Sequence, residues 1–247
     1  MAKKLVEYYD LSYAEMMAEK FGSVSSSFDQ KGFVKHMKEH LGEEAFLARQ
    51  DLYADALEIF LGDDPIANLD VFRAIWGEEL KQETGMFTEG WWLWPISRYV
   101  ARHACKMPKE TYAFLKEFTK RHTGEFAIRP LLMEFNEETM HVMLKWSLDE
   151  NVHVRRLSSE GLRIALPWAN KTTAGIQDFD RFKEILSNLR HDRSKFVQKS
   201  VGNNLNDLFK HDPSLAAKIV EEWERGEQSD ALQWIIRHGR RSIDKKK

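Results

Sequence analysis

The stretch that decides the fold is Asp149-Glu-Asn-Val-His-Val-Arg-Arg-Leu-Ser-Ser-Glu-Gly-Leu-Arg-Ile-Ala-Leu-Pro-Trp168. Asp149 and Asn151 are residue types that favour a turn or a helix cap. After them, apolar or small residues recur at helical spacing, at Val154, Leu157, Gly161 and Ala165. This spacing keeps one side of a helix free to pack against a core. We therefore predict a turn that leads into an amphipathic helix.

The same helix carries charged residues away from its packing side. At 100° per residue, Arg156, Glu160 and Arg163 fall within about 60° of one another. Proline cannot continue a helix, so we expect the helix to stop at Pro167, with Trp168 just beyond the stop. The stretch thus predicts one helix with a packing face and an Arg/Glu/Arg face.

A second copy of this pattern follows at residues 191–208. The two copies align at one offset of 43 residues, which pairs Asp149 with Asp192 and Val154 with Val197. A period of about 40–47 residues with two helices in each unit is typical of HEAT-type repeats. One such unit cannot bury its apolar face alone, so the units must stack.

The composition agrees with a helical chain. The 247 residues are 43% apolar, with only 13 glycines and 6 prolines, and no useful stretch alternates as a strand would. We therefore predict an all-α fold, a HEAT-like α-solenoid or α–α superhelix. We expect a single domain over residues 1–247, with variable helices in 1–94 and the repeats in 95–241.

The sequence lacks the patterns of a membrane span, an internal disulfide, and a metal or nucleotide site. No uninterrupted apolar run reaches about 18 residues, so we expect no membrane span and no membrane partner. The single cysteine, Cys105, allows no internal disulfide, and we expect it to be a small buried packing residue in a cytoplasmic protein. Metal-binding and nucleotide-binding motifs are absent. The sequence therefore predicts no metal site and no cofactor.

The charge is distributed unevenly along the chain. Residues 151–247 contain 19 Lys and Arg against 13 Asp and Glu, whereas residues 1–150 contain 18 against 26. A basic half that carries the repeats could hold a polyanion such as DNA. A repeat protein whose surface charge is merely uneven would give the same count, so charge alone does not decide between the two.

Aromatic and acidic residues also have two explanations each. The run Trp91-Trp-Leu-Trp94 could stack on bases, but packing at the end of a helical stack is the favoured interpretation. The acids Glu125, Glu160 and Asp207 could be catalytic. From spacing alone, a helix-start acid at Glu125 and a surface ion pair at Glu160 are the simpler explanations.

Four blocks of sequence resemble the AlkC class of DNA alkylation repair glycosylases. They lie in order at residues 125–130 (Glu-Phe-Ala-Ile-Arg-Pro), 151–168, 200–208 and 234–239 (Trp-Ile-Ile-Arg-His-Gly). The resemblance implies a HEAT-like solenoid that excises N3-alkylated bases from double-stranded DNA, chiefly 3-methyladenine with 3-methylcytosine as a further candidate. It implies an active site lined by Glu125, Glu160 and Asp207.

The resemblance suggests further site residues. We expect Trp168 and Asn203 to contact the lesion. We expect five cations to hold the DNA backbone, namely Arg155, Arg156, Arg163, Lys199 and Arg237. We expect the enzyme to be a monomer. We also expect a monofunctional glycosylase without a strand-cleaving lyase step, since no lysine in these blocks stands as a Schiff-base nucleophile.

The chain departs from its apparent relatives at two positions. Ala165 and Gln198 stand where the relatives' pattern has arginine. Each loss is expected to remove a phosphate contact and weaken DNA binding. The alternative to an enzyme is therefore a non-catalytic HEAT-repeat module that binds damaged or branched DNA, or a protein partner.

Overall fold

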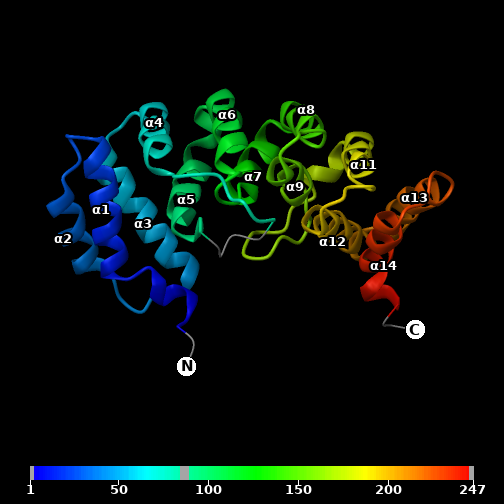
Figure 1. Cartoon of the computed structure of the whole chain (residues 1–247), viewed down its shortest axis with the longest axis horizontal. Helices are drawn as coiled ribbons and strands as arrows, with labels where there is room; N and C mark the ends of the chain where they lie inside the picture. The colour runs from blue at the N-terminus through cyan, green and yellow to red at the C-terminus, as the bar shows by residue number, and fades with distance from the viewer. Residues whose placement is uncertain (1–2, 84–88, 245–247) are drawn as a thin grey trace. The chain divides into compact units, whose positions relative to one another are not determined.

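A computed structural model describes residues 3–83 and 89–244, and Figure 1 shows the course of the chain. Every regular element among these residues is a helix, which confirms the all-α prediction. The chain divides into two compact units. The first unit holds residues 1–80 and 86–122, and the second holds residues 81–85 and 123–247. The prediction of a single domain over 1–247 stays a prediction.

The first unit is built from helices α1 to α6. Their bounds are α1 Leu11–Val24, α2 Gln30–His40, α3 Phe46–Leu61, α4 Pro65–Ile75, α5 Trp94–His103 and α6 Pro108–Phe118, with short 3-10 turns at Leu5–Tyr8, Trp91–Leu93 and Ala104–Lys106. Helix starts follow the expected chemistry, since Asp64 Oδ1 accepts hydrogen bonds from Ile66 N and Ala67 N directly beside Pro65.

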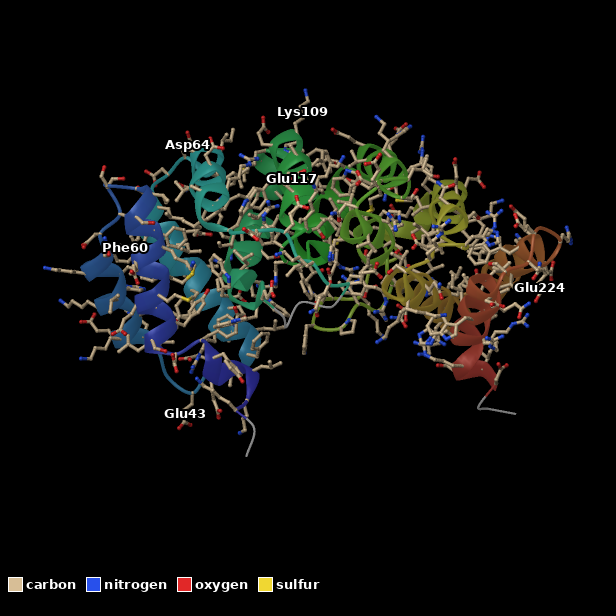
Figure 2. The ribbon with its side chains drawn as sticks, viewed as in Figure 1. Glu43, Phe60, Asp64, Lys109, Glu117 and Glu224 are labelled. Carbon is tan, nitrogen blue, oxygen red and sulfur yellow. The ribbon has the colours of Figure 1, made fainter. Side chains whose placement is uncertain are left out.

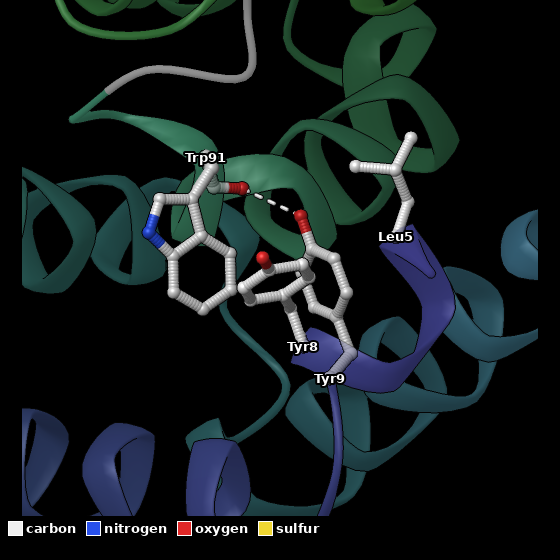
Figure 3. A pocket seen from close by; sticks show the side chains of 4 residues that line it. All are labelled: Leu5, Tyr8, Tyr9 and Trp91. Carbon is white, nitrogen blue, oxygen red and sulfur yellow. Dashed lines mark hydrogen bonds between the residues drawn. The ribbon is translucent and has the colours of Figure 1, made fainter. Parts of the chain in front are cut away.

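The tryptophan run packs within this first unit. Trp94 is fully buried, and the Tyr9 hydroxyl donates to the backbone oxygen of Trp91 at 2.7 Å. Figure 3 shows the Trp91 ring beside Tyr8 and Tyr9, with Leu5 on the other side of Tyr9. These contacts support the packing interpretation of the run. By contrast, the prediction that Cys105 is buried is wrong, because its side chain lies exposed in the turn after α5.

The second unit contains helices α7 to α14. Their bounds are α7 Glu125–Glu134, α8 Asn136–Trp146, α9 Val152–Glu160, α10 Ala174–Gln177, α11 Phe179–Asn188, α12 Lys195–His211, α13 Pro213–Glu224 and α14 Asp230–Asp244. Within this unit, α8, α11 and α13 form one layer, and α7, α9, α12 and α14 form the other (Figure 1).

The 43-residue repeat is present in the structure. Helices α8 and α11 begin at 136 and 179, and helices α9 and α12 begin at 152 and 195, so both pairs are 43 residues apart. The turns before α9 and α12 are also alike. Asp149 Oδ1 accepts from Asn151 N as Asp192 Oδ1 accepts from Ser194 N. Asn151 and Ser194 then cap their helices, as the predicted turn requires.

The predicted end of the organising helix is wrong. Helix α9 ends at Glu160 rather than at Pro167, and residues 161–166 form successive turns. Arg129 explains this difference, because its guanidinium donates to the backbone oxygens of Gly161 and Arg163 at 3.3 and 2.8 Å. These carbonyls are therefore satisfied outside a helix. The turns still bury Leu162, so the apolar pattern is used without helical geometry.

Charged side chains cover the outside of the helices. Figure 2 shows Glu43, Lys109 and Glu224 projecting away from the ribbon. In residues 3–83 and 89–244, no helix combines the length and the apolar character that crossing a membrane requires.

Candidate active site

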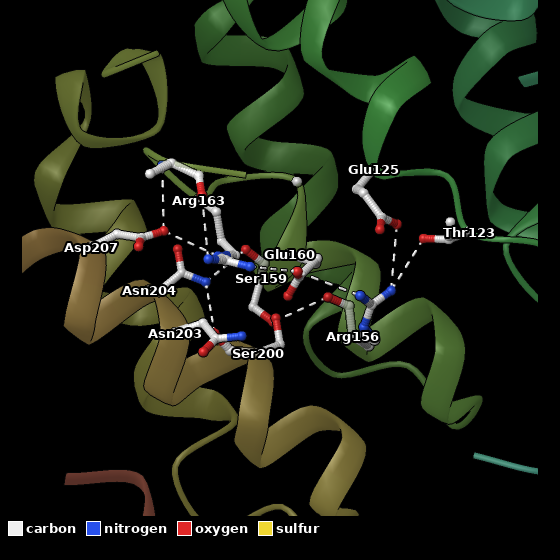
Figure 4. A network of polar contacts seen from close by, with 12 residues as sticks. Thr123, Glu125, Arg156, Ser159, Glu160, Arg163, Ser200, Asn203, Asn204 and Asp207 are labelled. Atoms are coloured by element: carbon white, nitrogen blue, oxygen red, sulfur yellow. Dashed lines mark hydrogen bonds and ion pairs between the residues drawn. The ribbon is translucent and has the colours of Figure 1, made fainter. Parts of the chain in front are cut away.

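The three predicted acids come together in the second unit. Glu125 is the first residue of α7, Glu160 is the last residue of α9, and Asp207 lies on α12 (Figure 4). Their exposed fractions are 1%, 5% and 5%. Three neighbouring helices therefore bring three carboxylates into a nearly buried cluster, where charges must be compensated.

Two arginines join the acids into an alternating series of ion pairs, here called the acid–arginine chain. Arg156 lies 3.4 Å from Glu125 Oε2 and 3.5 Å from Glu160 Oε1. Arg163 lies 3.0 Å from Glu160 Oε1 and 3.0 Å from Asp207 Oδ2. When all five groups are ionised, the three carboxylates and two guanidinium groups give the acid–arginine chain a net charge of −1.

The pKa values of the two glutamates shift in opposite directions. Burial raises the pKa of Glu125, and the Glu160 carboxylate adds to this rise while Arg156 opposes it. Burial acts in the same sense on Glu160, but Arg156 and Arg163 outweigh it and hold the pKa of Glu160 below its ordinary value. Glu160 therefore keeps its negative charge more readily than Glu125 does.

Arg129 holds the backbone beside the cluster and was not among the predicted site residues. Besides the two carbonyls of the 161–163 turn, its guanidinium donates to the backbone oxygen of Asn170 at 2.6 Å. It thus fixes both ends of the segment that carries Arg163 and Trp168. The signal in the sequence is its place in the block at residues 125–130, beside Glu125.

Helices α9 and α12 are joined by polar contacts beside the acids. The hydroxyls of Ser159 and Ser200 lie 2.7 Å apart, and Asn204 Nδ2 donates to the backbone oxygen of Ser159 at 2.9 Å. All three side chains are buried. Buried hydrogen bonds between two helices fix the spacing of the helices, and here they set the position of Glu160 relative to Asp207.

Arg155 and Gln198 occupy equivalent positions in the two repeats, and both point into the protein. Arg155 donates to Asp192 at 2.6 Å and to the backbone oxygen of Asp149 at 2.9 Å. Gln198, which is buried, donates to the backbone oxygen of Asp192 at 2.7 Å. The expectation that Gln198 marks a lost phosphate contact stays a prediction, and in this chain the side chain at position 198 holds the turn before its own helix.

The remaining predicted residues lie at the surface around the acids. Trp168 is 46% exposed and has a φ of 61°, a left-handed conformation that is rare for a residue other than glycine. Lys199 on α12 and Arg237 on α14 are exposed, and Asn203 is half-buried. Arg156 and Arg163 are instead enclosed by the carboxylates, so a role in holding phosphates stays a prediction for both.

Among the residues that the structure describes, no three His, Cys, Asp or Glu side chains are grouped so as to hold a metal ion.

Comparison with known proteins identifies the family. A family model described as DNA alkylation repair enzyme matches residues 98–243, more than half of the chain. The chain belongs to the DNA alkylation repair enzyme family. The residues that match the family model include all four blocks and both clear repeats, and they begin close to the start of the predicted 95–241 segment.

Two individual proteins resemble this DNA alkylation repair family member. The uncharacterized protein YhaZ of Bacillus subtilis (strain 168) is 39% identical over 148 residues, which are 60% of this chain and 41% of YhaZ. The solved structure of the Pseudomonas fluorescens alkylpurine DNA glycosylase AlkC, bound to DNA containing an abasic site analog, matches with a TM-score of 0.87 and 33% identity.

The AlkC match covers 99% of this chain and 66% of the AlkC chain. It supports membership of the AlkC class and confirms the helical-repeat fold. The chain nevertheless spans less than two thirds of the length of either relative.

Proposed function

We propose that this protein is a monofunctional DNA glycosylase that hydrolyses the N-glycosidic bond of N3-alkylated bases. The substrate we favour is 3-methyladenine in double-stranded DNA, with 3-methylcytosine as a second candidate. The observation that carries the proposal is the acid–arginine chain, in which three buried carboxylates from three helices converge. The resemblance to an AlkC solved with abasic-site DNA supports it.

The chemistry of the substrate suits a site made of carboxylates. An N3-methylated purine is cationic, so its glycosidic bond is already weak and the leaving base needs no strong general acid. The reaction instead requires stabilisation of the positive charge that develops on the sugar, and a water directed at C1′. Carboxylates in a water-poor site perform both tasks, because charges interact strongly where solvent is excluded.

The geometry suggests separate roles for the acids. Glu160, whose pKa is held low by two arginines, would supply lasting negative charge near the sugar. Asp207 Oδ2 accepts from Arg163 Nε and from Ala165 N, so the other carboxylate oxygen, Oδ1, is left to orient a water. Glu125, with its raised pKa, would add negative charge less readily.

DNA would be held by cations that are not used inside the cluster. Lys199 and Arg237 are exposed on α12 and α14, in the same helical layer as the acids. Contacts to phosphates position a protein on DNA without reading its sequence. The half-exposed Trp168 would contribute an aromatic face to the cationic base.

We also propose that the protein acts as a monomer in the cytoplasm. Light scattering of the purified protein tests the oligomeric state.

The deciding experiment is release of free base from methylated DNA by the purified protein. We expect 3-methyladenine to be released, with no strand cleavage. Protein that binds methylated duplex DNA and releases no base would instead be the non-catalytic binding module.

A further inference from the structure

Asn203 of α12 is held by two residues of α14. Its side-chain oxygen, Oδ1, lies 2.9 Å from Arg241 Nη2 and 3.0 Å from His238 Nε2. Arg241 is itself anchored, because its Nη1 donates to the backbone oxygen of His238. Both partners therefore reach the same atom of Asn203.

The chemistry of arginine decides which way the carboxamide faces. A guanidinium has no acceptor, so the atom that it contacts must be the oxygen of Asn203 and not the nitrogen. Burial and the nearby Arg241 lower the pKa of His238 to about 4, so His238 is neutral at pH 7 and donates through Nε2–H. With Oδ1 occupied twice, Asn203 can present only its two Nδ2–H groups to a ligand.

These N–H groups are available. Among the described residues, none accepts a hydrogen bond from Asn203 Nδ2, and the side chain is only half-buried. Lys199, which is exposed, lies one helical turn before Asn203, and Asp207 lies one turn after it. The donor is thus placed between an exposed cation and a predicted catalytic acid.

The close approach of α12 and α14 makes this arrangement rigid. A Cβ on Gly202 would lie 2.8 Å from the His238 ring, so only glycine allows the ring to sit against α12. The His238 ring also stacks on Trp234, with ring centres 4.7 Å apart and planes 10° apart. His238 is therefore held by contacts with both α12 and its own helix, and its Nε2 lies 3.0 Å from Asn203 Oδ1.

We propose that Arg241 and His238 are positioning residues that hold Asn203 with its N–H groups outward, and that Asn203 donates to a phosphate oxygen of the DNA strand beside the excised nucleotide. The proposal rests on the proposed function and refines its expected contact between Asn203 and the lesion. An anionic oxygen suits this donor better than a base edge does, because Lys199 and Arg241 surround it with positive charge.

A double-mutant cycle on DNA binding tests the positioning. The probe is a duplex that contains a tetrahydrofuran abasic-site analog, and affinity is measured by fluorescence anisotropy at fixed salt. We expect Asn203→Ala to weaken binding about tenfold in the parent, and to cost less than about twofold in the Arg241→Met background, where residue 241 has no donor for Oδ1. Arg240→Met is the matched control, since Arg240 lies on the same helix, carries the same charge and pairs with Glu224 instead.

A second pair of variants keeps the test valid if Arg241→Met fails to fold. Gln can donate to Oδ1 as His238 does, so His238→Gln should bind within about twofold of the parent. His238→Leu removes the donor and should weaken binding about as much as Asn203→Ala does. Melting temperatures identify variants whose folding is damaged.

The outcomes separate this proposal from the function on which it rests. The positioning role would be overturned if Asn203→Ala weakened binding by the same factor in the parent, Arg240→Met and Arg241→Met backgrounds. It would also be overturned by a parent that does not bind the duplex. A parent that binds the duplex and shows the expected coupling, yet releases no 3-methyladenine, would support the contact and remove only the enzymatic function.

Discussion

Each unit of this protein contains a network of carboxylates and arginines, and the two networks differ in burial. In the first unit, Arg98 donates to both oxygens of Asp51 at 2.8 and 2.7 Å, and Arg102 contacts Asp55 and Glu58. The side chains of this network are 28–57% exposed. Those of the acid–arginine chain in the second unit are 1–13% exposed.

The comparison shows that residue type does not distinguish a surface network from a candidate active site. Water screens the pairs of the first unit, so each contributes little to stability. The second network lies where solvent is excluded, so each charge depends on its partner and the pKa values of its glutamates move apart. Buried groups whose pKa values are shifted by neighbouring charges are typical of catalytic sites, and only the second network has them.

The largest expected difference is in stability. Arg163→Met leaves Glu160 and Asp207 buried without their shared cation, and we expect a loss of about 3–5 kcal/mol in the free energy of unfolding. Arg102→Met, the matched change in the first unit, should cost at most about 1 kcal/mol. Urea unfolding of both variants measures the difference, and equal losses would contradict the distinction between the networks.

The next effect is on catalysis. Asp207→Asn and Glu160→Gln keep size and hydrogen bonding but remove negative charge, so each should slow release of 3-methyladenine roughly a hundredfold, or about 3 kcal/mol. DNA affinity should barely change, because an acid near phosphates does not assist binding. Asp51→Asn in the first unit is the control and should release base at the parent rate. Folded Asp207→Asn and Glu160→Gln proteins with the parent rate would refute the assignment.

A smaller effect separates the exposed cations of α12 and α14 from a cation of α11, which lies in the other helical layer of the second unit. If Lys199 and Arg237 contact phosphates, Lys199→Gln and Arg237→Gln should each reduce the slope of log affinity against log salt by about 1. Lys183→Gln should leave the slope unchanged, because Lys183 lies on α11 and pairs with Glu222 at 2.7 Å. A salt slope near zero for the parent would mean that DNA is not the partner.

The smallest effect is a pH trend in stability. The pKa of Glu160 is depressed in the folded state, so its stabilisation is present above about 4.5 and is lost as pH falls through the folded value. The gap in unfolding free energy between the parent and Glu160→Gln should therefore narrow below pH 4.5. For Glu125 the folded pKa is raised, so the parent should lose stability relative to Glu125→Gln as pH rises above 4.5. Chemical unfolding between pH 3 and 7 measures both trends, and parallel curves would contradict them.

Local sequence determined much of this fold. The 43-residue offset and the apolar spacing after Asp149 predicted paired helices in repeats, because a helix buries every third or fourth residue whatever its partner is. The cap residues of α9 were also readable, since Asn151 bonds only to its own helix start. The resemblance in four blocks identified the family and pointed to Glu125, Glu160 and Asp207.

Only the tertiary structure decided what the charged groups contact. It ended α9 at Glu160 through Arg129, turned Arg155 and Gln198 inward, and enclosed Arg156 and Arg163 between the acids. Periodicity says which face of a helix a charge occupies. The partner on that face comes from another helix, so its distance, its burial and the direction of a carboxamide such as Asn203 are fixed only when the helices pack.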